Sequence, residues 1–442
     1  MTGVQTCALP ISAPDAGGAG ASDVLAAAKY TGQSGALEYG IFAALEDDSS
    51  EAEGRDFLAT RLRRSTEDFA LGWLGTWVDR PTRDREALVN AVDLDWYPRS
   101  AVAVQARAMR SDLRDGSVDS IGYGATAAFR YQPGGSLSQQ VEVVWLDDDF
   151  NVNDLGYQER ADVRRITSDT TLYRRSYPEG HWLSASQWGI KGGAFWNQQG
   201  QGLPGWLELR RGLNLRNGDS LTFGAWHEFS GIDDRITRGN GDLHLGDGGG
   251  AWIHWKQAES GPWRLDVEAN LRRESLGGSA WELTFGPKWV PTDALNLALR
   301  VGIDHSEGWL IWTGGREVGT FRRDEYSASL EGNWFPAPRH ELRLKFQWLG
   351  LDAEGRAGYS VAGGPDPQRL ATSPEDFSLA QFGLQLRYRY EIAPLSDLYL
   401  VYGRGGEFLE EGSQRRGAGQ LWRGALDRIT ADQLFLKLRY RF

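Results

Sequence analysis

Apolar and polar residues alternate along several stretches of this sequence, and this alternation limits the possible folds. WRLDVEANLRR (263–273) places tryptophan, leucine and valine on one side of an extended chain and arginines and carboxylates on the other. ELRLKFQW (341–348) and FGLQLRYRYEI (382–392) repeat the pattern. A period of two is that of a β-strand with one apolar face. No segment shows the pattern of an amphipathic helix, so an all-β chain is expected.

Which of the two strand faces points outward depends on the surroundings of the protein. Because the composition is polar while one strand face is apolar, we expect the apolar face to point outward into lipid and the charged face to point inward. The residues expected outward are Leu265, Val267, Leu342, Leu344, Leu384 and Leu386, and those expected inward are Arg264, Lys345 and Arg387.

Strand ends show a second regularity. An aromatic residue precedes a short turn containing proline or glycine in DWYPRS, FRYQPGG, RSYPEG, KWVPTD, NWFPAP and RYRYEIAPLS. Longer polar connections are expected at the opposite ends, near 46–54, 111–119, 231–248, 352–375 and 406–428. Short turns at one end and long loops at the other are typical of an outer-membrane barrel, whose aromatic residues form a girdle at the membrane interface. The predicted girdle residues are Tyr97, Tyr131, Tyr177, Trp289, Phe335, Tyr390, Tyr440 and Phe442.

Composition excludes several other classes. No run approaches the roughly 18 apolar residues of a transmembrane helix, in agreement with the mean hydropathy of −0.47. The chain nevertheless has 19 tryptophans. A net charge of −12 argues against a nucleic-acid partner. We therefore predict a large antiparallel up-and-down transmembrane β-barrel in the bacterial outer membrane. Its expected partners are outer-membrane lipid and the barrel-assembly machinery, which recognises terminal strands that end in an aromatic residue.

The N-terminal residues do not fit this pattern. MTGVQTCALPIS, which contains the only cysteine, Cys7, looks like translated sequencing adapter. Residues 1–20 are therefore expected to be a non-native or disordered leader, and residues 21–442 to form the barrel. About twenty-one strands can be counted, beginning with VLAAAKYTG. Because bacterial barrels normally have an even number, we expect a complete barrel of 22 to 26 strands and a truncated N-terminus.

Three motifs indicate a family. FNVNDLGYQERADVRR contains Phe150, Asn153, Asp154, Leu155, Gly156, Tyr157, Arg160 and Asp162, and AAKYTGQSG (27–35) and GIDDRITRG (231–239) accompany it. With these motifs the chain resembles the outer-membrane barrels of the domain of unknown function family 5916. In that family a sandwich similar to a family-nine carbohydrate-binding module usually precedes the barrel. The resemblance therefore implies a carbohydrate-derived solute.

Two of these motifs supply the candidate ligand-binding residues, at the lumen or in loops. They are Asn153, Asp154, Arg160 and Asp162 in the first motif, and Asp234, Arg235 and Arg238 in the second. A purely structural role is expected for both loops, and the alternative is that the first four residues form a paired charge network folded into the lumen and that both loops face the solute. DDDFNVND departs from the EF-hand pattern, because Asp154 replaces the turn glycine and Arg160 the bidentate glutamate. No metal site, cofactor or catalytic constellation is expected.

The arginines that alternate with apolar residues near the C-terminus are expected to line the lumen. Arg387, Arg389, Arg439 and Arg441 should pair with lumenal carboxylates such as Glu391, and a lining that selects anions is the weaker alternative. The leading functional prediction is passage or binding of a solute at the cell surface. The alternatives are the barrel portion of an outer-membrane hydrolase or carbohydrate-active protein, and a soluble all-β repeat protein such as a propeller.

Overall fold

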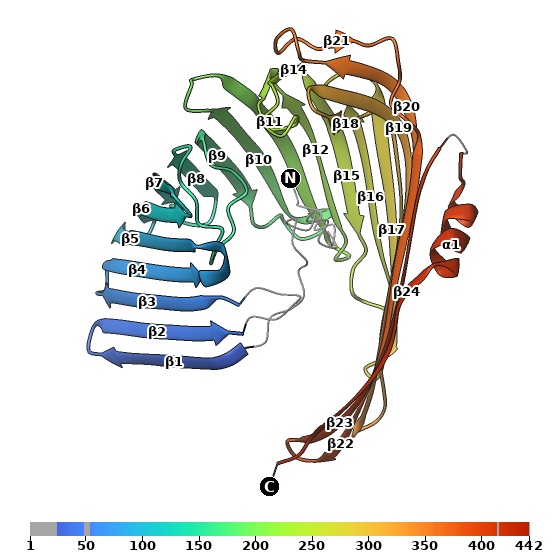
Figure 1. Cartoon of the computed structure of the whole chain (residues 1–442). Helices are drawn as coiled ribbons and strands as arrows, with labels where there is room; N and C mark the ends of the chain where they lie inside the picture. Colours follow the sequence, from blue (N-terminus) through green and yellow to red (C-terminus); the bar gives the residue numbers. More distant parts are fainter. Residues whose placement is uncertain (1–23, 48–53, 413–414, 442) are drawn as a thin grey trace. The chain divides into compact units, whose positions relative to one another are not determined.

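The computed structural model describes residues 24–47, 54–412 and 415–441. The predicted leader, Cys7 and Phe442 lie outside this part. The chain divides into two units, residues 1–169 with 195–201 and residues 170–194 with 202–442. Each unit consists of successive antiparallel strands joined in chain order (Figure 1).

The first unit contains eight complete strands and a short helix. Its elements are β1 (Val24–Ser34), β2 (Leu37–Glu46), β3 (Asp56–Ser65), β4 (Phe69–Arg80), the 3-10 helix η1 (Pro81–Arg83), β5 (Arg85–Arg99), β6 (Val102–Asp115), β7 (Val118–Tyr131) and β8 (Leu137–Leu146). The boundary between the units falls within β9 (Val163–Arg174) and β10 (Leu183–Trp196).

The second unit contains the remaining elements. They are β11 (Gly202–Leu215), β12 (Ser220–Glu228), β13 (Gly231–Asp233), β14 (Leu243–Leu245), β15 (Gly248–Lys256), β16 (Trp263–Arg273), β17 (Ser279–Thr292), β18 (Leu295–Gly314), β19 (Glu317–Ala337), β20 (His340–Ser360), β21 (Gln368–Arg369), β22 (Phe377–Ala393), β23 (Ser396–Glu411), α1 (Ala418–Asp427) and β24 (Ile429–Arg439).

The strands form one large sheet. Across the described residues it has 22 strands, while β13 and β14 pair separately. One member, β21, has only two residues, and without it twenty-one strands remain. The predicted all-β class and the count of about twenty-one strands are confirmed. The predictions that further strands precede residue 24 and that a complete barrel has 22 to 26 strands stay predictions.

The strand register confirms two chemically different faces. Leu342 lies opposite Tyr388 and Leu344 opposite Leu386, whereas the intervening Arg343 lies opposite Arg387. Successive side chains of a strand point to opposite faces, so leucines and aromatics share an apolar face and charged residues share a polar face. On the apolar face of β24, Leu434 and Leu436 are 68% and 72% exposed. Such exposure is costly in water and favourable against lipid.

The predicted short turns all occur at one end of the strands, as their alternating direction requires. In each unit they include two-residue connections, at 100–101 in the first and at 293–294, 338–339 and 394–395 in the second. We call this the short-turn end. Long connections at the opposite end are 147–162, 229–247, 361–376 and 412–428. The prediction was wrong at 111–119, where β6 and β7 are joined by a tight turn at Gly116, whose φ of 59° suits glycine.

The expectation that no amphipathic helix occurs was also wrong, because α1 forms within the last long connection. Its N-terminus is capped by Gln420, whose side chain accepts a hydrogen bond from the Gly417 N–H at 3.1 Å. Leu421 and Ala425 are fully buried on the apolar face of β20, β22 and β23. Two glycines within ten residues weaken the helical signal in the sequence, so packing on the sheet supplies the missing stability. None of the helices in the described part of the chain is long and apolar enough to cross a membrane.

Candidate functional site

The connection between β8 and β9, residues 147–162, folds onto the polar face of the first unit. We call it the polar-face loop. Phe150 is only 3% exposed, and its backbone lies over Gly122 on β7. A Cβ at Gly122 would come within 2.2 Å of Phe150 backbone atoms, so only glycine allows this approach. The Asn151 N–H also donates to the Ser111 hydroxyl of β6 at 3.1 Å.

Asp154, in the middle of this loop, is bound by two arginines of the strand ends. The Arg85 guanidinium donates to both carboxylate oxygens at 3.0 Å, and Arg80 Nε lies 3.3 Å away. The Asp154 side chain is 5% exposed and each arginine side chain 18%. A bidentate pair of this kind fixes both position and orientation. Asp154 therefore anchors the loop to β4 and β5.

The other three predicted residues of this motif stabilise the loop itself. The Asn153 side chain accepts a hydrogen bond from the Gln158 N–H at 2.8 Å. Arg160 donates from Nε and Nη2 to the Asp162 carbonyl at 3.2 and 3.1 Å. The Asp162 carboxylate accepts from the Gln198 N–H. The loop thus folds onto the polar face, where Asp154 pairs with Arg80 and Arg85, which the sequence pattern did not identify.

Between the loop and the short-turn end, the polar face of the first unit carries a row of ion pairs. Arg61 Nη2 donates to Asp93 at 2.7 Å, and Arg63 Nη2 donates to Asp95 at 3.0 Å. They border a cavity of about 410 Å³ that is also lined by Gln105, Arg107, Gln140 and Glu142. Guanidinium, amide and carboxylate groups can bind a polar solute through directed hydrogen bonds.

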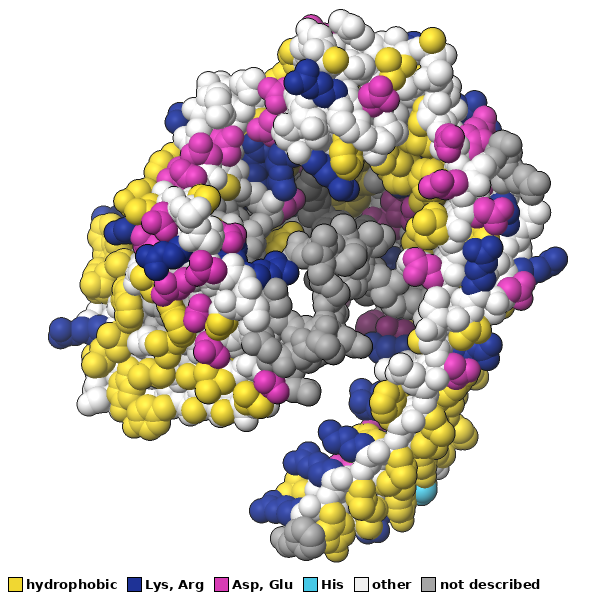
Figure 2. Space-filling model, viewed as in Figure 1, with side chains coloured by type: hydrophobic (Ala, Val, Ile, Leu, Met, Phe, Trp, Pro, Cys, Tyr) yellow, Lys and Arg dark blue, Asp and Glu magenta, His cyan; other side chains and the backbone are white. Residues whose placement is uncertain are grey.

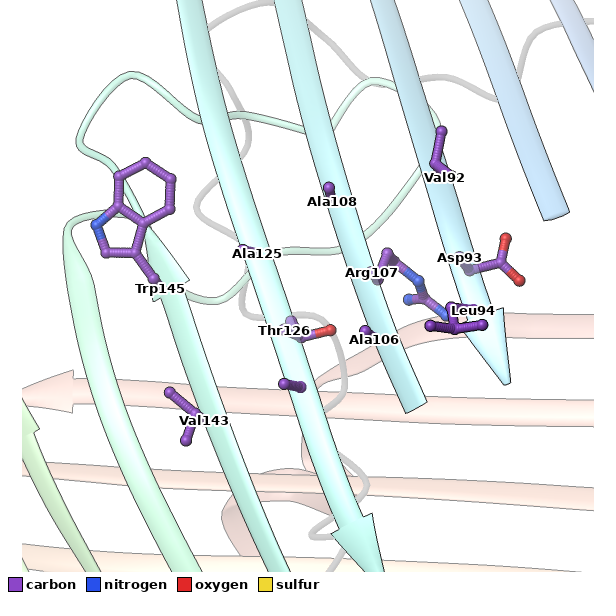
Figure 3. A pocket seen from close by; sticks show the side chains of 11 residues that line it. Val92, Asp93, Leu94, Ala106, Arg107, Ala108, Ala125, Thr126, Val143 and Trp145 are labelled. Atoms are coloured by element: carbon purple, nitrogen blue, oxygen red, sulfur yellow. The ribbon is translucent and has the colours of Figure 1, made fainter. Parts of the chain in front are cut away.

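The same strands carry a second hollow of about 450 Å³ (Figure 3). Four small side chains lie at its centre, with larger apolar ones around them, namely Ala106, Ala108, Ala125, Ala127, Val92, Leu94, Val143 and Trp145. These residues belong to the apolar face by register. This hollow therefore suits lipid chains and offers little to a polar solute.

The second predicted motif lies in the connection 229–247 of the second unit. The Asp233 carboxylate accepts hydrogen bonds from the N–H groups of Arg235 and Ile236 at 3.0 and 2.9 Å, which makes a capped turn. The Arg238 guanidinium lies 4.3 Å from the centre of the Trp312 ring. Arg235 is exposed and Asp234 is half-buried. These contacts attach the connection to β18, and a purely structural role for this loop stays a prediction.

A third connection, 361–376, also covers part of the polar face. Pro374 lies over Gly319 and Gly355, where a Cβ at Gly355 would come within 1.9 Å of the Pro374 carbonyl oxygen. The neighbouring Phe321 is 3% exposed and contacts Trp309 and Phe377. Each unit thus has one long connection that packs on its polar face through glycines.

Basic side chains line the polar face of the second unit towards the short-turn end. Figure 2 shows basic groups along one side of the segment that ends at the C-terminus and hydrophobic groups along the other. Arg387 and Arg389 do pair with carboxylates of this face, although with Glu341 and Asp397 and not with Glu391, the example given by the sequence pattern. Arg343, Arg387 and Arg389 converge on Glu341, with Arg387 Nη2 at 3.7 Å, and Arg389 also donates to Asp397 at 2.8 Å. Both carboxylates are nearly buried.

The predicted girdle residues differ in their positions. Tyr131, Trp289 and Tyr390 share the apolar face, and Trp289 stacks on Trp263 with ring centres 5.8 Å apart. Trp96 lies opposite Phe69 and Trp334 opposite Leu342 on the apolar face, and the register shifts directly after each of them, at Tyr97 and Phe335. The Tyr177 hydroxyl instead forms a hydrogen bond of 2.8 Å with the Ser186 hydroxyl, and its ring stacks on His181. Tyr440 is 55% exposed. An interfacial role for this set stays a prediction.

The described residues contain no group of three His, Cys, Asp or Glu side chains placed to hold a metal ion.

The model of the family described as "Domain of unknown function (DUF5916)" matches residues 70–440. The chain belongs to this family. No curated protein matches the chain. The predicted family and fold class are confirmed, and the exposed apolar face of a large antiparallel sheet is that of a bacterial outer-membrane protein.

Several solved structures are similar to this DUF5916 chain. The siderophore receptor PirA from Pseudomonas aeruginosa is 10% identical, with a TM-score of 0.47, over 83% of this chain and 76% of the receptor. The outer membrane transporter YddB from Escherichia coli is 8% identical, with a TM-score of 0.47, over 92% of this chain and 74% of the transporter. The RagAB peptide importer is 8% identical, with a TM-score of 0.44, over 83% of this chain and 51% of the importer chain.

Proposed function

We propose that residues 21–442 form the wall of an outer-membrane barrel that binds or passes a polar solute along its polar face. In such a barrel the apolar face would lie against lipid and the ion-pair rows would face a lumen. The short turns would then lie on the periplasmic side and the long connections at the cell surface, as in other bacterial barrels.

The polar-face loop is the observation that carries this proposal. It bears the family motif, it packs on the polar face through Gly122, and Asp154 holds it by a nearly buried bidentate ion pair. A loop whose only task was to join β8 to β9 would not need to bury Phe150. We therefore assign to the loop the role of a constriction above the row formed by Arg61, Arg63, Asp93 and Asp95.

The chemistry of the solute follows from this row. Paired guanidinium and carboxylate groups provide donors and acceptors that match the hydroxyls of a sugar as well as charged groups. This supports a carbohydrate-derived solute, which the family resemblance implies. The hydrolase alternative and recognition by the barrel-assembly machinery rest on the sequence alone and stay predictions.

Solute entry into proteoliposomes tests the proposal. Gly122→Ala introduces a Cβ against the Phe150 backbone and displaces the loop without changing any charge. We expect this variant to admit a neutral oligosaccharide several times faster than the unsubstituted protein. Gly403→Ala is the matched control, because nothing lies within 4 Å of its new Cβ. Equal entry rates for all three proteins, with normal membrane insertion, would disprove the role of the loop.

A further inference from the structure

Helix α1 lies on the apolar face of the sheet, which is unexpected for part of a long polar connection (Figure 1). Gly350 and Gly406 make room for it, since a Cβ at Gly406 would come within 2.3 Å of the Ala425 carbonyl oxygen. Trp422 contacts the rings of Phe346 and Trp348 edge-on, at centre distances of 5.5 and 5.4 Å. All of these sheet residues share the face that carries the exposed leucines.

The level of α1 along the strands can be located from the register. Trp348 pairs with Phe382, eight positions from the pair His340–Tyr390 at the short-turn end. At about 3.3 Å per residue this is about 26 Å along the strand. A tilt of about 40° reduces it to about 20 Å across the membrane, close to the roughly 25 Å height of the apolar band. The helix therefore lies at the far edge of this band.

The chemistry of the face changes at this level. Beyond the helix the same face carries Asp324 and Asp352, whereas Leu344 and Leu386 lie on the side towards the short turns. Arg415 anchors the segment before the helix to Asp324 at 3.0 Å, and the Arg416 N–H donates to Asp352 at 3.0 Å. The helix thus lies on the boundary between the apolar band and the charged surface.

Charge complementarity identifies what the free side of the helix contacts. In a chain of net charge −12, residues 415–428 contain four arginines and a single acid, Asp427. Arg416 and Arg428 are partly neutralised by Glu410, at 2.6 and 3.8 Å. Arg423 is exposed and has no ion-pair partner among the described residues, and the neighbouring Leu426 is 37% exposed. An exposed leucine and an unpaired arginine on one interfacial helix fit a lipid surface with negatively charged phosphates.

We propose that α1 is an interfacial helix that binds the anionic phosphate headgroups of the outer leaflet, with Arg423 as the phosphate ligand and Leu426 inserted among the acyl chains. The helix then fixes the barrel at its outer interface. This interaction is separate from solute passage.

Lipid enrichment around the helix tests this proposal. A fluorophore is attached at Gly419→Cys on α1, where nothing lies within 4 Å of a new Cβ, in a Cys7→Ser background, and the full chain is placed in phosphatidylcholine bilayers containing about one fifth phosphatidylglycerol. Energy transfer to headgroup-labelled phosphatidylglycerol is compared with transfer to headgroup-labelled phosphatidylcholine. We expect several-fold preference for the anionic lipid, lost in Arg423→Gln and kept in Arg316→Gln, a matched exposed arginine in the β18–β19 turn.

Each remaining outcome would overturn the proposal. Equal transfer to both lipids, or weak transfer to either, would show that the helix does not bind anionic headgroups. If inorganic phosphate removed the preference for anionic lipid while sodium chloride at the same ionic strength did not, the helix would instead hold a site for free phosphate. A preference that survives Arg423→Gln would show that another group provides it.

Discussion

The carboxylate of Asp154 is bound at both oxygens by the guanidinium of Arg85, although the two residues are 69 positions apart in the chain. The contact joins the first residue of β5 to the middle of the polar-face loop, and Arg80 adds a second positive charge. Removing any one of these three side chains would be costly, because the charges of the remaining groups would stay nearly buried without an opposite charge beside them.

Asp154→Asn should therefore release the loop. We expect a loss of about 3 kcal/mol in the free energy that holds the loop on the sheet, because Arg80 and Arg85 would keep their charges without a carboxylate partner. Limited proteolysis at residues 147–162 in proteoliposomes measures this. Asp148→Asn removes the same charge from an exposed position of the same loop and should leave cleavage unchanged. Equal protection in both variants would contradict the anchoring role.

The sheet was predictable because strand alternation is a local property. A half-apolar strand must place one set of side chains in each environment, so Leu344 and Lys345 indicate their faces without any knowledge of the neighbouring strands. The short turns are equally local, since proline and glycine restrict or permit backbone angles by themselves.

The contacts of the site were not predictable, because they join residues distant in the chain. Gly122 and Gly406 are strand glycines in the sequence, and only the structure shows that Phe150 and Ala425 need the space. Glu391 is close to Arg389 in the sequence, yet the strand register brings Glu341 opposite Arg389. A strand glycine can mark such a close approach, but it does not identify the partner.

The orientation of the sheet is tested by adjacent residues of β22. Leu386 lies on the apolar face and Gln385 on the polar face. Leu386→Arg should destabilise the inserted protein by about 2–4 kcal/mol, as expected for a cation against the hydrocarbon layer. Gln385→Arg introduces the same side chain one position away and should cost much less. Urea unfolding from lipid vesicles measures both, and equal losses would contradict the assignment of the faces.

The basic groups near the short-turn end should favour anions. Arg387 shares Glu341 with Arg343 and Arg389, so the cluster retains excess positive charge. Arg387→Gln should lower the anion-to-cation permeability ratio by a factor of about two, an effect that weakens as salt screens the charge. Reversal potentials in planar bilayers measure the ratio. Arg316→Gln removes one positive charge from a loop and serves as the control. An unchanged permeability ratio in Arg387→Gln would place this cluster away from the solute path.

The attachment of α1 should depend on pH through Asp324, which lies on the charged surface beyond the apolar band. Burial raises the pKa of this carboxyl, but the hydrogen bond from His305, 2.6 Å away, and the charges of His305, Arg322 and Arg415 outweigh burial and hold the pKa below its usual value. A depressed carboxyl pKa contributes stability at neutral pH that is lost as the pH falls through the folded-state value. The fluorophore at Gly419→Cys should therefore report release of the helix only below about pH 4.

Asp324→Asn separates this effect from general acid denaturation. The variant should have a more loosely attached helix at pH 7, and its helix signal should change less between pH 7 and pH 3. Asp293→Asn, in the β17–β18 turn at the opposite end of the strands, is the matched control and should behave as the unsubstituted protein. An unchanged acid transition in Asp324→Asn would show that other carboxylates near Arg415, such as Asp352 or Glu354, carry the pH dependence.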